Sequence, residues 1–215
     1  MGKVAIVTGG TGALGGAVAR RFVEAGYEVH ATSSRAAEDA RTPVKVHAVD
    51  LTDFEAVRAF AAEFSEVCAV VLSAGGFAMA ELAALTRADV DAMIDANFKT
   101  AASALAAFSS KLVSGSAVVV VGSQSYEGAA RSAAYAASKA AVVSLAKSAA
   151  LEWKERRVRV NAVLPDTIDT PANRRDLPGQ DFTKWAEPRE IADVIVWLCS
   201  PAAAVVSGNA IRVGR

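Results

Sequence analysis

The stretch SAAYAASKAAV (132–142) carries one tyrosine and one lysine, Tyr135 and Lys139, in a run that is otherwise alanine, serine and valine. If this stretch is helical, residues four apart lie on the same face, so the ammonium group lies near the phenol. A phenol ordinarily titrates near ~10, and a nearby positive charge lowers its pKa. The spacing therefore predicts a tyrosine suited to acid–base catalysis, although an ordinary tyrosine on a surface helix has the same pattern.

A glycine-rich turn lies near the N-terminus in TGGTGALGG (8–16), between an apolar stretch and a helical pattern. It contains the spacing Gly10-x-Gly12-x-x-Gly15. Backbone N–H groups at a helix N-terminus attract a pyrophosphate, and glycines permit the tight turn and the close approach of the ligand. Because the motif follows the first strand of a βαβ pattern, it predicts a dinucleotide-binding site.

The end of the second strand-like stretch, YEVHATSSR (27–35), is where residues would contact the 2′ position of such a cofactor, and so indicates whether it is NAD(H) or NADP(H). An acidic residue there would bind the 2′-hydroxyl of NAD. This chain instead has four residues whose hydroxyl and guanidinium groups suit a 2′-phosphate: Thr32, Ser33, Ser34 and Arg35. The sequence therefore predicts that NADP(H) is preferred over NAD(H), although a polar loop with an incidental arginine has the same composition.

The composition indicates a globular chain without the charge pattern of a nucleic-acid or membrane-surface protein. The 215 residues are 53% hydrophobic, and 23 basic residues balance 23 acidic ones. The sequence contains no run approaching the roughly 18–20 apolar residues of a membrane span. Cys68 and Cys199 lie in apolar stretches without metal-ligand spacing, which favours reduced thiols and a cytoplasmic location. His30 and His47 are isolated in strand-like stretches, so we expect neither a metal site nor a histidine base.

Short apolar stretches alternate with alanine-rich helical patterns along the whole chain. We expect strands over 4–10, 27–33, 44–50, 67–76, 116–123, 158–165 and 208–214, and helices over 14–26, 52–64, 87–112, 132–156 and 187–200. In the second of these helices, Thr52 followed by Glu55 predicts an N-terminal capping box. Near-continuous apolar strands between helices are typical of a parallel sheet covered on both faces. The pattern therefore predicts one α/β domain over 1–215, a doubly wound Rossmann fold with about seven parallel strands.

Taken in chain order, these motifs resemble the short-chain dehydrogenase/reductase family over essentially the whole sequence. TGGTGALG resembles that family's glycine signature, and Tyr135-x-x-x-Lys139 its catalytic pair. The resemblance implies that the serine of VGSQS is catalytic, with Ser123 as the candidate and Ser125 as the alternative. It also implies a catalytic role for Asn97 in DANFKT.

The same resemblance implies where the cofactor is bound. Asp50-Leu51 resembles the pair that contacts adenine, and Ser73-Ala74-Gly75 stands where the family usually has Asn-Ala-Gly. The stretch VNAVLPDTIDTP is expected beside the nicotinamide and the phosphates. Besides the residues at the end of the second strand, the expected cofactor contacts are Gly9, Thr11, Gly12, Leu14, Gly15, Asp50, Leu51, Ser73, Ala74, Gly75, Tyr135, Lys139, Pro165, Ile168 and Thr170.

The chemistry that follows is hydride transfer between the nicotinamide and a small carbonyl or alcohol substrate. Tyr135 would act as general acid/base, Lys139 would lower its pKa and bind the nicotinamide ribose, and Ser123 would bind the developing oxyanion. As the resemblance suggests, Asn97 would hold a water for proton relay. A short loop at about 171–186 is expected at the substrate, and we expect a substrate contact from each of two aromatic residues, Phe77 and Trp185.

Two further readings of the same residues remain open. LPDTIDTPANRRDLPGQDFTKW (164–185), GALG and SAGGF look like the corresponding stretches of dihydropteridine reductases, which implies reduction of a quinonoid dihydropterin. A cofactor-binding sensor without turnover is the alternative from another functional class. In either case the alanine- and serine-rich helices expected over 87–112 and 132–156 predict, as in the family, a homodimer or homotetramer.

Overall fold

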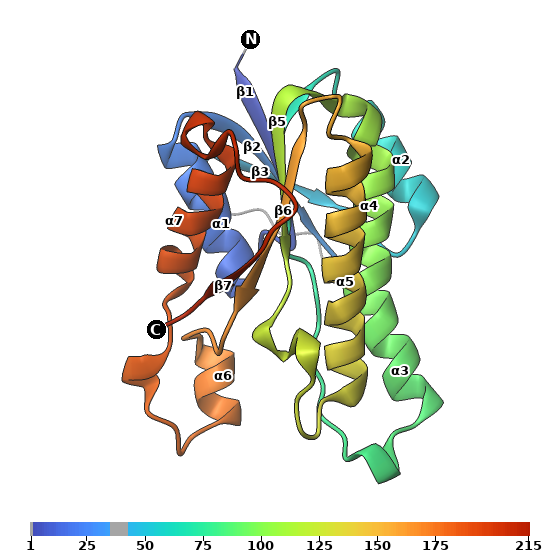
Figure 1. Ribbon diagram of the computed structural model, residues 1–215, viewed down its shortest axis with the longest axis vertical. Coiled ribbons are helices and arrows are strands. Elements are labelled where there is room, and N and C mark those ends of the chain that lie inside the picture. Colours follow the sequence, from blue (N-terminus) through green and yellow to red (C-terminus); the bar gives the residue numbers. More distant parts are fainter. Residues whose placement is uncertain (1, 35–42) are drawn as a thin grey trace.

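A seven-stranded parallel sheet forms the centre of the molecule (Figure 1). The structure is a computed structural model that describes residues 2–34 and 43–215, so Arg35 lies outside the described residues. The strands are β1 (Lys3–Thr8), β2 (Tyr27–Ser33), β3 (Val44–Ala48), β4 (Val67–Leu72), β5 (Leu112–Val121), β6 (Arg159–Pro165) and β7 (Ala210–Val213). Their order in the sheet is β3-β2-β1-β4-β5-β6-β7, with every neighbouring pair parallel.

Helices cover both faces of the sheet (Figure 1). One face carries α1 (Ala13–Glu24) and α7 (Pro188–Cys199), and the other carries α2 (Phe54–Ala62), α4 (Thr100–Phe108) and α5 (Ala133–Glu152). Successive strand residues point to opposite faces, so Ile6 packs into one core and Val7 into the other. Two short helices, α3 (Arg87–Met93) and α6 (Pro171–Asp176), lie beyond the carboxyl ends of the strands. Among the described residues, no helix combines the length and the apolar character needed to cross a membrane.

The strand order reverses between β1 and β4, which sets the position of a binding site. In an open α/β sheet, ligands bind outside the carboxyl ends of the strands at this switch point. The glycine-rich turn after β1 and the SAGG stretch after β4 meet there. The predicted fold class, a Rossmann-like α/β domain with helices on both faces of a parallel sheet, is confirmed.

Several element boundaries differ from the expected ones. β1 ends at Thr8, so the glycines that follow form a turn, and β5 begins at Leu112, four residues before the predicted start. The expected helix over 87–112 is divided by a π-helical segment, Ile94–Lys99. Short 3₁₀ turns occupy Leu82–Ala84, Ser109–Lys111, Gln124–Glu127, Phe182–Lys184 and Pro201–Ala203.

The N-terminal cap of α2 is also not the predicted one. The Asp53 carboxylate accepts hydrogen bonds from the backbone N–H groups of Glu55, at 2.9 Å, and Ala56, at 3.2 Å. The Thr52 hydroxyl instead donates to Asp50 at 2.7 Å. The capping box at Thr52 is therefore wrong, because Asp50 engages that hydroxyl and the next residue is an equally good cap.

Candidate active site

The glycine-rich turn brings the start of α1 against the end of β1 with no space for side chains. Gly9 has a φ of +67°, and a Cβ atom there would lie 2.8 Å from the Cα atom of Ala74. A Cβ atom on Gly15 would lie 2.2 Å from the Gly9 carbonyl oxygen. The Gly12 N–H closes the turn by donating to that same oxygen at 3.0 Å. Glycine at these positions therefore lets the backbone N–H groups of the first helical turn approach a ligand directly.

A cavity of about 360 Å³ opens beside this turn, at the carboxyl ends of β1, β2 and β4. Of the predicted cofactor contacts, it is lined by Gly9, Thr11, Gly12, Thr32, Ser33, Ser34, Asp50, Leu51, Ser73, Ala74 and Gly75. The Thr11 hydroxyl donates to the Ser33 hydroxyl at 3.1 Å. The Thr32 hydroxyl is buried and has no hydrogen-bond partner among the described residues. A glycine cradle beside an unsatisfied buried hydroxyl fits a bound dinucleotide, since such a group is costly unless a ligand or water meets it.

A second cleft of about 390 Å³ continues from this cavity and shares Ser73 and Gly75 with it. The predicted residues that line it are Leu14, Phe77, Ser123, Tyr135, Lys139, Pro165 and Ile168, together with the alternative Ser125. These residues come from the start of α1, the end of β6, the loops after β4, β5 and β6, and the first half of α5. A long ligand could therefore span both hollows, with one end at the glycine turn and the other at the Tyr–Lys pair.

The Tyr135 phenol is mostly buried in this cleft, against the ring of Phe77. The two ring centroids are 4.9 Å apart and the rings are nearly perpendicular. Burial raises the pKa of Tyr135, and the nearby Ser123 hydroxyl lowers that pKa only in part. The sequence predicted a lowered pKa from the spacing to Lys139, and the direction found is the opposite. The reason is desolvation of the phenolate by residues that the fold brings in from other loops.

Lys139 lies deeper than Tyr135 on the same helix face. Its Nζ atom is 5.8 Å from the centroid of the Tyr135 ring and donates to the Val121 carbonyl oxygen at 3.0 Å. Desolvation by burial lowers the pKa of Lys139 to about 8. The ammonium group is thus poised to change its charge just above neutral pH, which the spacing alone did not indicate.

Asn97 is held in the π-helical segment and connects two parts of the cleft. Its side-chain oxygen accepts from the Gly76 N–H, and its nitrogen donates to the Gly76 carbonyl oxygen and to Ser138, each at 3.1 Å. Asn97 is buried and is absent from the residues that line the cleft. A π segment often marks a functional position, because it aims a side chain away from the direction an α-helix would give it.

Ser123 and Ser125 both line the cleft, and they differ in their contacts. Ser123 is buried and its hydroxyl lowers the pKa of Tyr135 in part, whereas the backbone N–H of Ser125 donates to the Ser123 hydroxyl at 3.2 Å. The geometry therefore favours Ser123 over Ser125 as the partner of the phenol.

Besides Asn97, three predicted residues among those described line neither hollow. Trp185 is only 7% exposed and packs against Phe182, with ring centroids 4.8 Å apart. Thr170 caps α6 by accepting from the Asn173 N–H at 3.1 Å. Gly15 lies beneath the glycine turn. The predicted ligand contacts of these three residues stay predictions.

The glycine turn, the Tyr–Lys pair and the strand order can be compared with known families. The family model described as short chain dehydrogenase matches residues 3–181. The chain belongs to the short-chain dehydrogenase family. The match covers the glycine turn, the Tyr–Lys pair and most of the loop after β6.

Curated relatives match the chain over nearly their whole length. An acetoacetyl-CoA reductase from Synechocystis sp. is 33% identical, covering 98% of this chain and 94% of the relative. A galactitol 2-dehydrogenase from Rhizobium johnstonii is 31% identical, covering 99% and 93%. A cyclic-di-GMP-binding biofilm dispersal mediator protein from Escherichia coli is 28% identical, covering 96% and 93%. The chain is an NAD(P)-dependent oxidoreductase of the short-chain type.

Solved short-chain dehydrogenase structures share the whole fold. The aldohexose dehydrogenase of Thermoplasma acidophilum has a TM-score of 0.90 and 26% identity, covering 99% of this chain and 92% of that one. A short chain dehydrogenase from Burkholderia cenocepacia in complex with NADP has a TM-score of 0.88 and 25% identity, covering 99% and 96%.

Proposed function

We propose that this short-chain dehydrogenase is an NADP(H)-dependent enzyme that interconverts a small carbonyl compound and its alcohol. The observation that carries the proposal is the Tyr135 phenol, which lies with Ser123 in a cleft that runs on from the glycine cradle. A proton donor beside a dinucleotide site is the arrangement that carbonyl reduction requires. The proposed substrate is small, because the cleft holds about 390 Å³.

The bound nicotinamide supplies the hydride, and the chain's own residues handle the proton and the charge. Because burial raises the pKa of Tyr135, its phenol stays protonated at neutral pH and can donate to the carbonyl oxygen. The Ser123 hydroxyl donates a hydrogen bond to the same oxygen as negative charge develops there. The Lys139 ammonium, on the same helix face, favours the phenolate that remains after proton transfer.

The test is the Tyr135→Phe variant, which removes the hydroxyl and keeps the ring contact with Phe77. We expect kcat for carbonyl reduction to fall by about 100-fold or more, the scale of positioned proton transfer. The far-UV circular dichroism spectrum is the control and is expected to stay unchanged. A variant that keeps more than about a tenth of the wild-type rate removes Tyr135 from the role of general acid.

The preference for NADP(H) rests on the end of β2. Thr32, Ser33 and Ser34 line the cavity beside the glycine turn. None of these three residues carries a carboxylate that would bind the 2′-hydroxyl of NAD. The relative from Burkholderia cenocepacia with NADP bound also supports it. Titrating the protein with NADPH and with NADH, followed by quenching of its three tryptophans, should give at least about tenfold tighter binding of NADPH, or ~1.4 kcal/mol. Tighter binding of NADH would overturn this preference.

A quinonoid dihydropterin is the second candidate substrate, as in the dihydropteridine reductases that the segment 164–185 resembles. The observation that favours it is Phe77, whose ring is 56% exposed and stands against Tyr135, where a planar ring could stack. Steady-state rates with a quinonoid dihydropterin, simple ketones and quinones distinguish the two. The best kcat/KM identifies the substrate class.

A non-catalytic sensor is a third candidate, and the relative described as a cyclic-di-GMP-binding biofilm dispersal mediator favours it. Tight NADPH binding without oxidation by any carbonyl would support this role.

For the location of the enzyme in the cell we propose the cytoplasm, supported by two cysteines that are both free, Cys68 and Cys199.

A further inference from the structure

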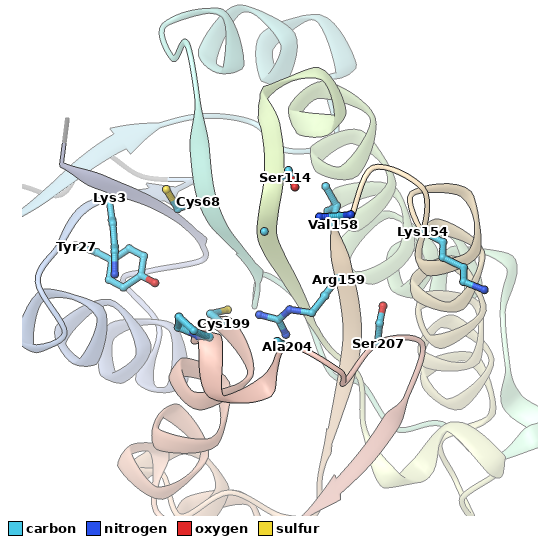
Figure 2. Close-up of a pocket in the computed structure, with 13 residues that line it drawn as sticks. Lys3, Tyr27, Cys68, Ser114, Lys154, Val158, Arg159, Cys199, Ala204 and Ser207 are labelled. Atoms are coloured by element: carbon cyan, nitrogen blue, oxygen red, sulfur yellow. The ribbon is translucent and has the colours of Figure 1, made fainter.

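A separate cavity of about 670 Å³ lies at the amino ends of the strands, whereas the active-site cleft lies at their carboxyl ends. Its walls come from the starts of β1, β2, β4, β5 and β6 and from the end of α7 (Figure 2). Within the described part of the chain, it shares no lining residue with the active-site hollows. Its volume is in the range of about 300–1,000 Å³ that is usual for small-molecule sites.

A bulge between β4 and β5 opens this cavity. Val67 pairs with Leu112, whereas Ala69 pairs with Ala117, so the four residues 113–116 lie opposite Cys68 alone. The bulge has a defined structure, because the Ser116 hydroxyl donates to the Val67 carbonyl oxygen at 2.8 Å. Bulges of this kind bend a strand and commonly border binding sites.

The inner part of the cavity contains a buried arginine without a negative partner. Arg159 is 8% exposed, and Figure 2 shows its side chain extending from β6 into the middle of the cavity. Its guanidinium donates to the carbonyl oxygens of Leu198, at 2.5 Å, and Ser200, at 3.2 Å. Carbonyls orient the group but carry no net charge, so the positive charge of Arg159 is not neutralised.

The outer part of the cavity adds three exposed cations, Lys3, Lys154 and Arg157. Among residues 2–34 and 43–215, no carboxylate lines the cavity and none forms an ion pair with these cations or with Arg159. The neighbouring Cys199 thiol stays neutral, because burial raises its pKa to about 12. The cavity is therefore strongly positive, although the chain as a whole has no net charge.

We propose that this cavity binds a small aromatic phosphate ester, at a site distinct from the cofactor cleft. Three of the five guanidinium N–H groups of Arg159 donate to the carbonyl oxygens of Leu198, Ser200 and Val206, so the two that remain can donate to a phosphate group. The outer cations add attraction. The wall beside these cations is apolar, formed by the Tyr27 ring, Val158 and Pro201, which suits an aromatic group on the ester. Failure of this proposal would leave the proposed reaction untouched, because the two sites share no residue.

The experiment is a calorimetric titration of the full chain with 4-nitrophenyl phosphate, with and without excess NADPH. We expect binding of one molecule per chain that NADPH does not change and that weakens as salt rises from about 50 to about 200 mM. Inorganic phosphate and 4-nitrophenol are each expected to bind at least about tenfold more weakly. Displacement of the probe by NADPH would assign it to the cofactor cleft and overturn the proposal, as would no binding at about 10 mM probe.

Two matched double variants locate the site. Lys3→Gln with Arg157→Gln removes two cations of the outer part and leaves the buried Arg159 in place, so the fold is retained. We expect about tenfold weaker probe binding or more. The control, Arg87→Gln with Lys147→Gln, removes the same charge from exposed positions outside all three hollows and should leave binding within about twofold. Equal weakening in both variants would mean general charge attraction, and the proposal would fall.

Discussion

Gly75 shows how tightly the catalytic side chains are spaced. A Cβ atom at this position would lie 2.6 Å from the Asn97 side-chain oxygen and 3.3 Å from the Lys139 Nζ atom. Any side chain would therefore push apart two groups that come from different helices. Because Gly75 has no Cβ atom, the Asn97 amide and the buried Lys139 ammonium can both lie against its backbone.

Replacing Lys139 should raise stability while lowering activity, because its charge is buried without a carboxylate. The unfolded lysine keeps its proton up to an ordinary pKa of 10.5, whereas in the folded protein the pKa is about 8. The unfolded state thus binds more protons between these values, so wild-type stability rises with pH across that window. We expect the free energy of unfolding of Lys139→Met to exceed that of the wild type by about 1–3 kcal/mol at pH 6.5. This difference should shrink above pH 8.

Urea unfolding of Lys139→Met at several pH values measures this gain. Lys147→Met is the matched control, since Lys147 is exposed on the same helix. The control should show no such pH dependence. A gain that stays constant from pH 6.5 to 10 would contradict a lowered pKa for Lys139.

At the scale of elements, the predictions held where local pattern and long-range packing agree. All seven strands were expected, because a buried parallel strand is a continuous apolar run and β-branched residues fill it. The π-helical segment was missed, because IDANFK (94–99) contains no glycine or proline that would mark a break in the helix. The early start of β5 was missed since Ser114 and Gly115, the latter with a φ of +91°, look like a turn.

In the candidate site, too, some features were predictable from local sequence and others depend on packing. Residue types and order were enough to select Tyr135, Lys139 and Ser123, and the fold brings them into one cleft. The direction of the Tyr135 pKa shift was not predictable, because it depends on burial by loops far away in sequence. The burial of Trp185 was missed for the same reason.

The start of α2 offers a direct test at this scale, since two adjacent residues could each be the cap. Asp53→Ala removes the carboxylate that accepts two backbone hydrogen bonds, and should cost about 1 kcal/mol of unfolding free energy. Thr52→Ala removes only an exposed hydrogen bond to Asp50 and should cost less than about half as much. Chemical denaturation of both variants under one condition gives the comparison. A larger loss for Thr52→Ala would restore the capping box that the sequence predicted.

The whole molecule presents a stripe of exposed residues along α5 that suits self-association. Ala137, Ser144, Ser148 and Leu151 are exposed at spacings of seven, four and three residues, which places them on one helix face. Leu151 is 78% exposed. Small side chains allow two helices to approach closely across a twofold axis, which is the homodimer predicted from the sequence.

Light scattering coupled to size exclusion tests this assembly. We expect a mass of twice 22.2 kDa, or a further doubling for a tetramer. Ser144→Arg places a charge in the middle of the stripe and should reduce the mass to that of one chain. Ala59→Arg, at an exposed position on α2, is the control and should leave the mass unchanged. A wild-type protein that elutes as a single chain would rule out the predicted dimer.

The π-helical segment also fixes how many residues must lie between α3 and α4. A wide turn holds one residue more than an α-turn, so α3 and α4 are offset in phase by that residue. Deleting one residue from 94–99 would remove the wide turn and give a continuous α-helix, in which α3 and α4 keep their present faces. The side chains inside the segment would change direction, and Asn97 would then face another way. In any graft or deletion through this helix, the number of residues matters as much as their identity.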